Sequence, residues 1–290
     1  MFQNATAAID GSPASFHAAI VGAQLVSPRT GSLQLVCVAE GSKESGERFF
    51  TSASTGDEKR EEILVRCEAD LSSAQAAIGT LATVQDRKVL VGRTADALLE
   101  FATANHADLL CVGRGRHRIN LGSVSSAIVR KAEIPVVVVP AGVSTGPRLR
   151  RLLLGFDGSD HARRAAVRVG RIASELGAKV RIDFVLAPPW PLPPEGMELE
   201  PEDLARLAGK ARGADLDEAS ELVRGEGGEV EAVDFELGDP AERLLDRADS
   251  WNADLIVVGA RGQSPARRFL LGGVSDKLTS RSAHPILIFR

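Results

Sequence analysis

The chain has 290 residues, and 44% of them are hydrophobic and 26% charged, which is typical of a soluble globular protein and leaves room for one large domain or two of about 145 residues. The formal net charge of −4 argues against nucleic acid as a main partner, because a mildly acidic surface repels the phosphate backbone. Aromatic residues are scarce and tyrosine is missing, so Val, Leu, Ile and Ala must build most of the core.

The first half of the chain alternates short apolar runs with helical segments. An expected first strand ends at Asp10, and Ser12-Pro13 has the cap-then-proline order that opens a helix. The last expected strand of this half is Val136–Val139, and a stretch rich in Gly, Ser and Pro follows it. The sequence therefore predicts a first domain at 1–140, a linker at 141–149 and a second domain at 150–290.

The second half shows the same alternation. Ser159 can cap a helix that runs to Leu176, and Gly177 provides its left-handed stop. A Pro-rich loop after Leu186 precedes a polar helix around 201–224, and Asp239-Pro240 opens the next helix. A last helix is expected near 274–282. The expected strands are 152–156, 180–186, 230–236, 254–258 and 285–289.

The two halves are repeats of one another. Asp10-Gly11-Ser12 recurs as Asp157-Gly158-Ser159 at an offset of 147, and the segment 91–115 recurs as 237–262. Strands that are apolar on both faces and alternate with helices indicate a parallel sheet covered on both sides. We therefore predict an α/β fold with two doubly wound domains in tandem, each with a five-stranded parallel sheet. Ligands bind such sheets beyond the carboxyl ends of the strands.

The cysteines do not suggest a disulfide framework. Cys37, Cys67 and Cys111 lie far apart in the sequence and form no CxxC pair. Cys37 and Cys111 lie within apolar runs, where a free cysteine behaves as a small hydrophobe. This pattern predicts a reducing compartment. Because no apolar run approaches the roughly 18 residues of a membrane span, we expect a soluble, cytoplasmic protein without a membrane partner.

Two kinds of residue fall at the carboxyl ends of expected strands. Asp10 and Asp157 follow the first strand of each half, where a carboxylate can accept hydrogen bonds from a nucleoside. The alternative is a turn aspartate that bonds its own loop, since Asp-Gly-Ser is a common turn tripeptide. In the second half, Gly259-x-x-Gly262 is followed by nine residues and then by Gly272 at a helix start. Glycine backbone and a helix N-terminus together favour phosphate oxygens.

The same loop is shorter in the first half. Only Arg114 separates Gly113 from Gly115, and six residues precede Gly122. A loop that lacks several residues cannot follow the same path around a triphosphate. We therefore expect the second half to carry the main ligand site.

Together, these motifs in both halves resemble the universal stress protein family, over about residues 5–140 and 150–290. The resemblance implies ATP or another adenine nucleotide as ligand, with Mg²⁺ entering only with the nucleotide. The nucleotide-binding positions that it implies are Asp157, Val185, Gly259, Gly262, Gly272, Gly273, Val274 and Ser275. A weaker second site would comprise Asp10, Val38, Gly113, Gly115, Gly122, Ser123 and Ser125.

One position departs from the family pattern. Gly273 stands where the resemblance leads us to expect Ser or Thr, so one hydroxyl donor is missing while the backbone donor remains. A hydrogen bond to a charged group contributes about 1.5–3 kcal/mol, which predicts an affinity about 10- to 100-fold lower.

The resulting hypothesis is a regulatory protein of the stress response that binds ATP mainly in the second domain. We expect no catalytic residue and at most slow ATP hydrolysis, because no general base stands out. Neither a Walker phosphate loop nor a complete dinucleotide fingerprint is present, and no His has metal-ligand spacing. His161 is the histidine expected near Asp157. The alternative is an interaction scaffold that has lost nucleotide binding.

The last strands suggest how the halves associate. Val136–Val139 and Ile286–Phe289 would be apolar edge strands, which soluble proteins usually cover. In the family that the chain resembles, last strands pair between subunits. We therefore expect the two halves to pair as an internal pseudo-dimer, with a homodimer as a further expectation.

Overall fold

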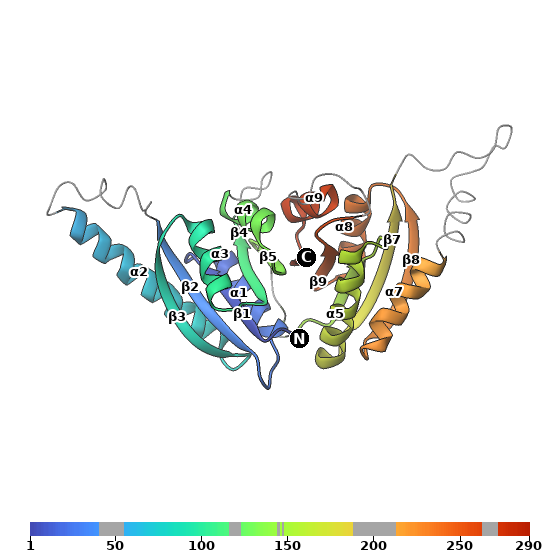
Figure 1. Ribbon diagram of the computed structural model, residues 1–290, viewed down its shortest axis with the longest axis horizontal. Coiled ribbons are helices and arrows are strands. Elements are labelled where there is room, and N and C mark those ends of the chain that lie inside the picture. The colour runs from blue at the N-terminus through green and yellow to red at the C-terminus, as the bar shows by residue number, and fades with distance from the viewer. Residues whose placement is uncertain (41–54, 116–122, 144–145, 147, 188–212, 263–271) are drawn as a thin grey trace. The chain divides into compact units, whose positions relative to one another are not determined.

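The computed structural model describes residues 1–40, 55–115, 123–143, 146, 148–187, 213–262 and 272–290 (Figure 1). These residues belong to two compact units, Met1–Thr145 and Gly146–Arg290. The chain thus passes from unit 1 to unit 2 within the stretch 141–149. None of the described helices is long and apolar enough to cross a membrane.

Unit 1 contains a five-stranded parallel sheet in the order β3-β2-β1-β4-β5. The chain order moves outward twice from β1 and then returns to β4, so right-handed crossovers place α1 and α2 on one face of the sheet and α3 and α4 on the other. Its strands are β1 (Asn4–Ile9), β2 (Ser32–Glu40), β3 (Thr83–Gly92), β4 (Leu109–Arg114) and β5 (Val136–Pro140). Its helices are α1 (Pro13–Leu25), α2 (Thr55–Ile78), α3 (Thr94–Ala104) and α4 (Ser123–Lys131).

Unit 2 repeats this arrangement, with the order β8-β7-β6-β9-β10. Its strands are β6 (Arg151–Gly155), β7 (Lys179–Leu186), β8 (Glu229–Leu237), β9 (Leu255–Gly259) and β10 (Ile286–Phe289). Its helices are α5 (Asp160–Leu176), α7 (Gly213–Gly225), α8 (Pro240–Trp251) and α9 (Gly273–Arg281). The prediction of two tandem doubly wound α/β domains is therefore confirmed. The predicted Pro-rich loop and the first part of the polar helix around 201–224 lie outside the described residues.

Local sequence signals explain where the helices begin and end. The Ser12 side chain accepts a hydrogen bond from the Ser15 amide at 3.2 Å, and Ser159 accepts one from the Ala162 amide at the same distance. Asp239 caps α8 by accepting from the Ala241 amide at 3.0 Å. Gly177 ends α5 with a φ of 62°, the left-handed conformation that favours glycine.

The core of each unit lies along its sheet, and it includes β5 and β10, which stand last in the two strand orders. The side chains of β5 and β10 are all buried, as are Leu109–Val112 of β4 and Leu255–Val258 of β9. Burial on both faces is characteristic of parallel sheets that carry helices on each side. The register of the sheet also shifts at equivalent positions, between Leu33 and Gln34 and between Val180 and Arg181, so the repeat extends to an irregularity of the backbone.

The prediction that the cysteines form no disulfide is wrong for two of them. Cys37 on β2 and Cys67 on α2 form a disulfide whose Cα atoms are 5.7 Å apart. Thirty residues separate them in the sequence, but α2 packs against β2 and places one opposite the other. The cysteines therefore no longer support the predicted reducing compartment. Cys111 is free and buried, and burial raises the pKa of its thiol, which keeps it unreactive.

Candidate functional site

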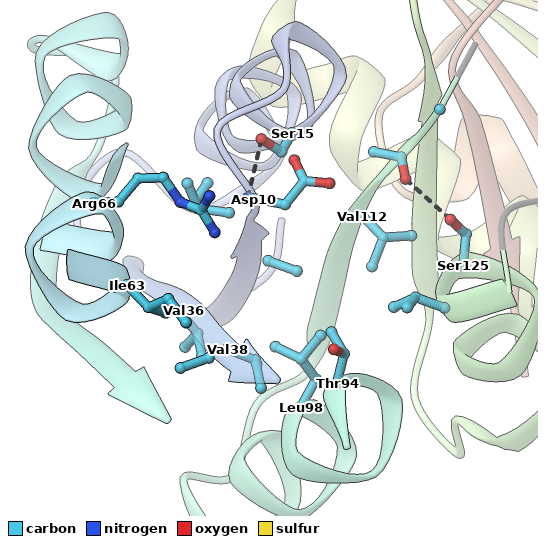
Figure 2. Close-up of a pocket in the computed structure, with 16 residues that line it drawn as sticks. Asp10, Ser15, Val36, Val38, Ile63, Arg66, Thr94, Leu98, Val112 and Ser125 are labelled. Atoms are coloured by element: carbon cyan, nitrogen blue, oxygen red, sulfur yellow. Dashed lines mark hydrogen bonds between the residues drawn. The ribbon is translucent and has the colours of Figure 1, made fainter. Parts of the chain in front are cut away.

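Unit 1 contains a hollow of about 460 Å³ at the carboxyl ends of β1, β2 and β4 (Figure 2). This is the switch point of strand order, where α/β sheets bind ligands, and the volume lies within the usual range of small-molecule sites. The predicted residues that line this unit 1 hollow are Asp10, Val38, Gly113, Gly115 and Ser125. Gly122 lies outside the described residues, as does the side chain of Ser123.

Asp10 has a structural role that does not use up its carboxylate. Its Oδ1 accepts a hydrogen bond from the Ser12 amide at 3.0 Å, as expected of a turn aspartate. Asp10 is nevertheless exposed and lines the hollow, and a carboxylate has four lone-pair sites. Both interpretations of this residue are therefore compatible in one conformation.

Gly113 is required by packing as well as by any ligand. A Cβ at this position would lie 2.6 Å from the Ser15 amide nitrogen and 2.7 Å from the Ala14 carbonyl carbon, so only glycine lets α1 approach β4 this closely. The Gly113 carbonyl accepts a hydrogen bond from the buried Ser125 hydroxyl at 3.0 Å, which fixes the start of α4. By contrast, a Cβ at Gly115 would meet no atom within 4 Å.

The hollow also contains residues that the sequence did not single out. Ile63 and Arg66 reach it from α2, and Thr94 and Leu98 reach it from α3. Among the described residues that line the hollow, Arg66 is the only cation. Its position depends on how α2 packs across the sheet, and α2 carries no motif that would have pointed to it.

In unit 2, Asp157 and Gly262 are brought together. Oδ1 of Asp157 accepts from the Ser159 amide at 3.0 Å, and a Cβ at Gly262 would lie 2.5 Å from Oδ2. The Ser159 hydroxyl donates to the Arg261 carbonyl at 3.1 Å and so joins the loop after β6 to the glycine loop after β9. The Asp157 carboxylate therefore faces the backbone of the glycine loop. The nine residues between Gly262 and Gly272 lie outside the described residues.

The other predicted residues of unit 2 surround this contact in different ways. Gly259 matches Gly113, since its Cβ would lie 2.8 Å from the His161 Cβ and 3.0 Å from the Ala162 amide nitrogen. Ser275 is buried and donates from its hydroxyl to the Gly259 carbonyl at 2.8 Å. Gly273 is exposed, and its Cβ would meet no atom within 4 Å.

The start of α9 completes the predicted set. Gly272 precedes the helix, and its amide donates to the Ala260 carbonyl at 2.8 Å. Val274 in the first turn of α9 and Val185 near the end of β7 are both half-buried.

Positive charge gathers around His161, which lies against Gly259 of unit 2. The pKa of His161 is lowered by burial and by three nearby cations, Arg164, Arg261 and Arg290. His161 is therefore neutral at pH 7, and the arginines supply the charge. Among the described residues, no group of three His, Cys, Asp or Glu side chains could hold a metal ion. This part of unit 2 is thus suited to an anion.

An ion-pair network on β7, β8 and α8 of unit 2 surrounds one buried carboxylate, that of Asp183. Asp183 is 1% exposed, and its Oδ2 lies 2.9 Å from Nε of Arg247 on α8. Arg247 also pairs with Glu236, and Arg181 pairs with Asp234 at 2.6 Å. Burial raises the pKa of Asp183 to about 6, although Arg247 acts in the opposite direction.

Unit 1 carries apolar residues at the equivalent positions. Val36 matches Asp183 and Phe101 matches Arg247. Val36 lines the unit 1 hollow, so the two units differ in charge at this point of the sheet.

Comparisons with known proteins agree on one family. The profile of the Universal stress protein family matches residues 1–140 and 148–290. Stress response protein NhaX of Bacillus subtilis (strain 168) is 27% identical over 161 residues, which cover 48% of this chain and 97% of that protein. A universal stress protein of Thermus aquaticus, described by its position in the QAH/OAS sulfhydrylase 3′ region, is 33% identical over 147 residues, which cover 49% of this chain and 98% of its own.

Solved structures also resemble the chain over its whole length. The crystal structure of a universal stress protein from Archaeoglobus fulgidus DSM 4304 aligns with a TM-score of 0.68 over 99% of this chain and 98% of its own. At 20% sequence identity, this likeness shows the fold.

Proposed function

The chain belongs to the universal stress protein family, and from this premise we propose that it is a regulatory protein of the stress response that binds ATP or another adenine nucleotide, mainly in unit 2. In this proposal the nucleotide is a ligand whose binding changes the state of the protein. The observation that carries the proposal is the contact between the Asp157 carboxylate and Gly262, where a Cβ would lie 2.5 Å from Oδ2.

The chemistry around this contact favours a nucleotide with its phosphates at the glycine loop. The Gly262 backbone and the N-terminus of α9 offer N–H groups, and the helix dipole favours negative charge there. Arg164, Arg261 and Arg290 add positive charge around His161. The Asp157 carboxylate accepts hydrogen bonds, which suits a ribose hydroxyl, and the proposal assigns Val185 near the end of β7 to the adenine.

In this proposal the chain binds the nucleotide and does not depend on hydrolysing it. Mg²⁺ would enter with the nucleotide, because no metal-binding group of His, Cys, Asp or Glu occurs among the described residues. The Ser275 hydroxyl donates to the Gly259 carbonyl, so it serves to hold α9 in this conformation. The predicted cytoplasmic location and the pairing of β5 with β10 belong to the same proposal, and size-exclusion chromatography with cross-linking would test the pairing.

Two substitutions at the glycine loop test the nucleotide directly. Gly262→Val would push the Asp157 carboxylate out of place and cover the loop backbone, so we expect ATP affinity in unit 2 to fall at least tenfold. Gly273→Ser would supply the missing hydroxyl at an exposed position where a Cβ meets no atom within 4 Å, so we expect affinity to rise about tenfold. Isothermal titration calorimetry with ATP measures both changes.

Gly273→Ala is the matched control, because it adds the Cβ atom that Ser would add but not the hydroxyl. Its ATP affinity should remain close to that of the unmodified chain. Mass spectrometry of small molecules released from the purified protein would identify a ligand retained from the cell. If the unmodified chain neither releases nor binds a nucleotide, the interaction scaffold is the correct interpretation.

A further inference from the structure

One turn of α2 lines the unit 1 hollow, although no predicted motif lies there. Ile63 and Arg66 both line the cavity, and Figure 2 shows Arg66 extending from α2 toward Asp10. Asp10 and Arg66 are the two charged side chains among the described residues that line the hollow. A carboxylate accepts from hydroxyl or amino groups, whereas a guanidinium donates to phosphate in a bidentate manner. The hollow therefore offers separate partners for the two polar ends of a nucleotide.

The Cys37–Cys67 disulfide fixes this turn to the sheet. Cys67 follows Arg66 directly, and Cys37 lies on β2 between Val36 and Val38, both of which line the hollow. A covalent bond thus connects the helix turn that carries the cation to the strand that forms the wall of the hollow.

Noncovalent packing anchors the rest of α2 but does not extend to Arg66. Among the described side chains of α2, the buried ones are Cys67, Leu71, Ala74 and Ile78, which recur at helical spacing on the face toward the sheet. The side chains of residues 61–66 are half-buried or exposed. The turn that lines the hollow lies N-terminal to Cys67, and no described side chain of α2 on that side of Cys67 is buried.

The helix also contacts the loop that carries Asp10. Gly11 has a φ of +77°, and a Cβ there would lie 2.6 Å from Oδ2 of Asp70 on α2. A shift of α2 would therefore move Arg66 and also disturb the turn next to Asp10.

We propose that Arg66 is the anion-binding residue of the unit 1 hollow and that the Cys37–Cys67 disulfide holds it in place, so that ligand affinity in unit 1 depends on the thiol–disulfide state of the chain. This inference rests on the proposed function, nucleotide binding, and assigns the nucleotide phosphate in unit 1 to Arg66. The glycine loop of unit 1 is shorter in sequence than that of unit 2, so we expect fewer backbone donors for that phosphate, and the Arg66 guanidinium would replace them.

The switch needs a dithiol reductant and no other reactant. One thiolate of the dithiol attacks a sulfur of the disulfide and forms a mixed disulfide with it. The second thiolate of the dithiol then attacks the reductant's own sulfur in this mixed disulfide and releases the protein thiol. Two electrons and two protons pass to Cys37 and Cys67, and the dithiol becomes a cyclic disulfide. Cys111 is buried and takes no part, since burial raises the pKa of its thiol.

Unit-specific binding tests the role of Arg66. The full chain is photolabelled with 8-azido-ATP over a concentration series, and mass spectrometry quantifies the labelled peptides of each unit. Arg66→Ala should weaken labelling of unit 1 about tenfold, Arg66→Lys should weaken it less, and labelling of unit 2 should not change. Arg29→Ala removes an exposed arginine that does not line the hollow, and it should have no effect.

The redox dependence is measured on the same chains. Reduction with dithiothreitol should weaken unit 1 labelling about three- to tenfold, and reoxidation should restore it. The variant with both Cys37→Ser and Cys67→Ser should match the reduced chain and ignore the reductant, and the Arg66→Ala chain should also be insensitive. Circular dichroism checks that each variant is folded.

The outcomes separate this inference from the proposed function. Unchanged unit 1 labelling in Arg66→Ala, an equal redox effect with and without Arg66, or no labelling of unit 1 would each overturn the inference. Labelling of unit 2, and its loss in Gly262→Val, test the proposed function independently of Arg66 and the disulfide.

Discussion

Gly113→Ala is expected to destabilise unit 1 by about 3 kcal/mol, although it adds a single carbon atom. The new Cβ would lie 2.6 Å from the Ser15 amide nitrogen and 2.7 Å from the Ala14 carbonyl carbon. Both atoms belong to the backbone of the first turn of α1, so no side-chain rotation can relieve the contact. Overpacking of a close-packed core costs about 1–3 kcal/mol, and the rigid backbone places this site at the upper end.

Hydrogen exchange measured by mass spectrometry reports the stability of unit 1. Tryptophan fluorescence cannot do so, because both tryptophans, Trp190 and Trp251, lie in the second half of the chain. Peptides from β4 and α1 should lose protection in Gly113→Ala, and peptides from unit 2 should keep it. Gly115→Ala is the matched control, since its Cβ meets no atom within 4 Å, and it should change stability by less than about 0.5 kcal/mol. Equal protection in the two variants would show that the close approach of α1 to β4 is not required.

This contrast shows what a glycine motif in the sequence can and cannot indicate. The spacing of Gly113 and Gly115 predicts a loop that approaches phosphate, but the structure gives Gly113 a second requirement, which is the approach of a helix. Gly259 in unit 2 has the same relation to α5. Gly113 and Gly259 therefore remain necessary for packing even in a unit that binds no ligand, and their presence alone does not prove binding.

The fold itself could be predicted because its signals are local and repeated. Caps such as Ser12, Ser159 and Asp239 fix where helices begin, and continuous apolar runs fix the buried strands. Because the sequence is an internal repeat, these signals occur in both halves of the chain and support one another.

Packing between distant segments could not be predicted in the same way. Arg66 and Cys67 were missed because their positions depend on how α2 lies across β2, and α2 is a largely polar helix without a motif. The disulfide prediction failed for the same reason, since separation along the chain is a poor guide to separation across a sheet.

A second large effect concerns the buried pair of Asp183 and Arg247 in unit 2. The pKa of Asp183 is raised by burial to about 6, against about 3.9 in an unfolded chain. A carboxyl with a raised pKa contributes stability that is fully present below about pH 4 and is lost as the pH rises through 6. A difference of one between the folded and unfolded pKa corresponds to about 1.4 kcal/mol, so ionised Asp183 costs unit 2 about 3 kcal/mol at pH 7.5.

Arg247→Phe alone should therefore be harmful in a pH-dependent way. It leaves an ionised carboxylate buried without its nearest cation, which typically costs about 3–5 kcal/mol. Because Asp183 can take up a proton when the pH falls, the loss should be smaller at pH 5 than at pH 7.5. Urea unfolding followed by tryptophan fluorescence reports on unit 2, since Trp251 lies at the end of α8.

The double variant Asp183→Val with Arg247→Phe copies the residues of unit 1, where Val36 and Phe101 occupy these positions. Replacing a buried ion pair by well-packed apolar side chains is often neutral or stabilising by about 1–4 kcal/mol. We expect the double variant to exceed the unmodified chain by about 3 kcal/mol at pH 7.5 and by about 1 kcal/mol at pH 4.5. Carboxylates that do not contact Arg247 titrate alike in both chains and cancel in the difference, but Glu236 loses its partner Arg247 in the double variant. Glu236 loses the same partner in Arg247→Phe, so a difference between the double and the single variant that does not vary with pH would show that Asp183 is not the group responsible.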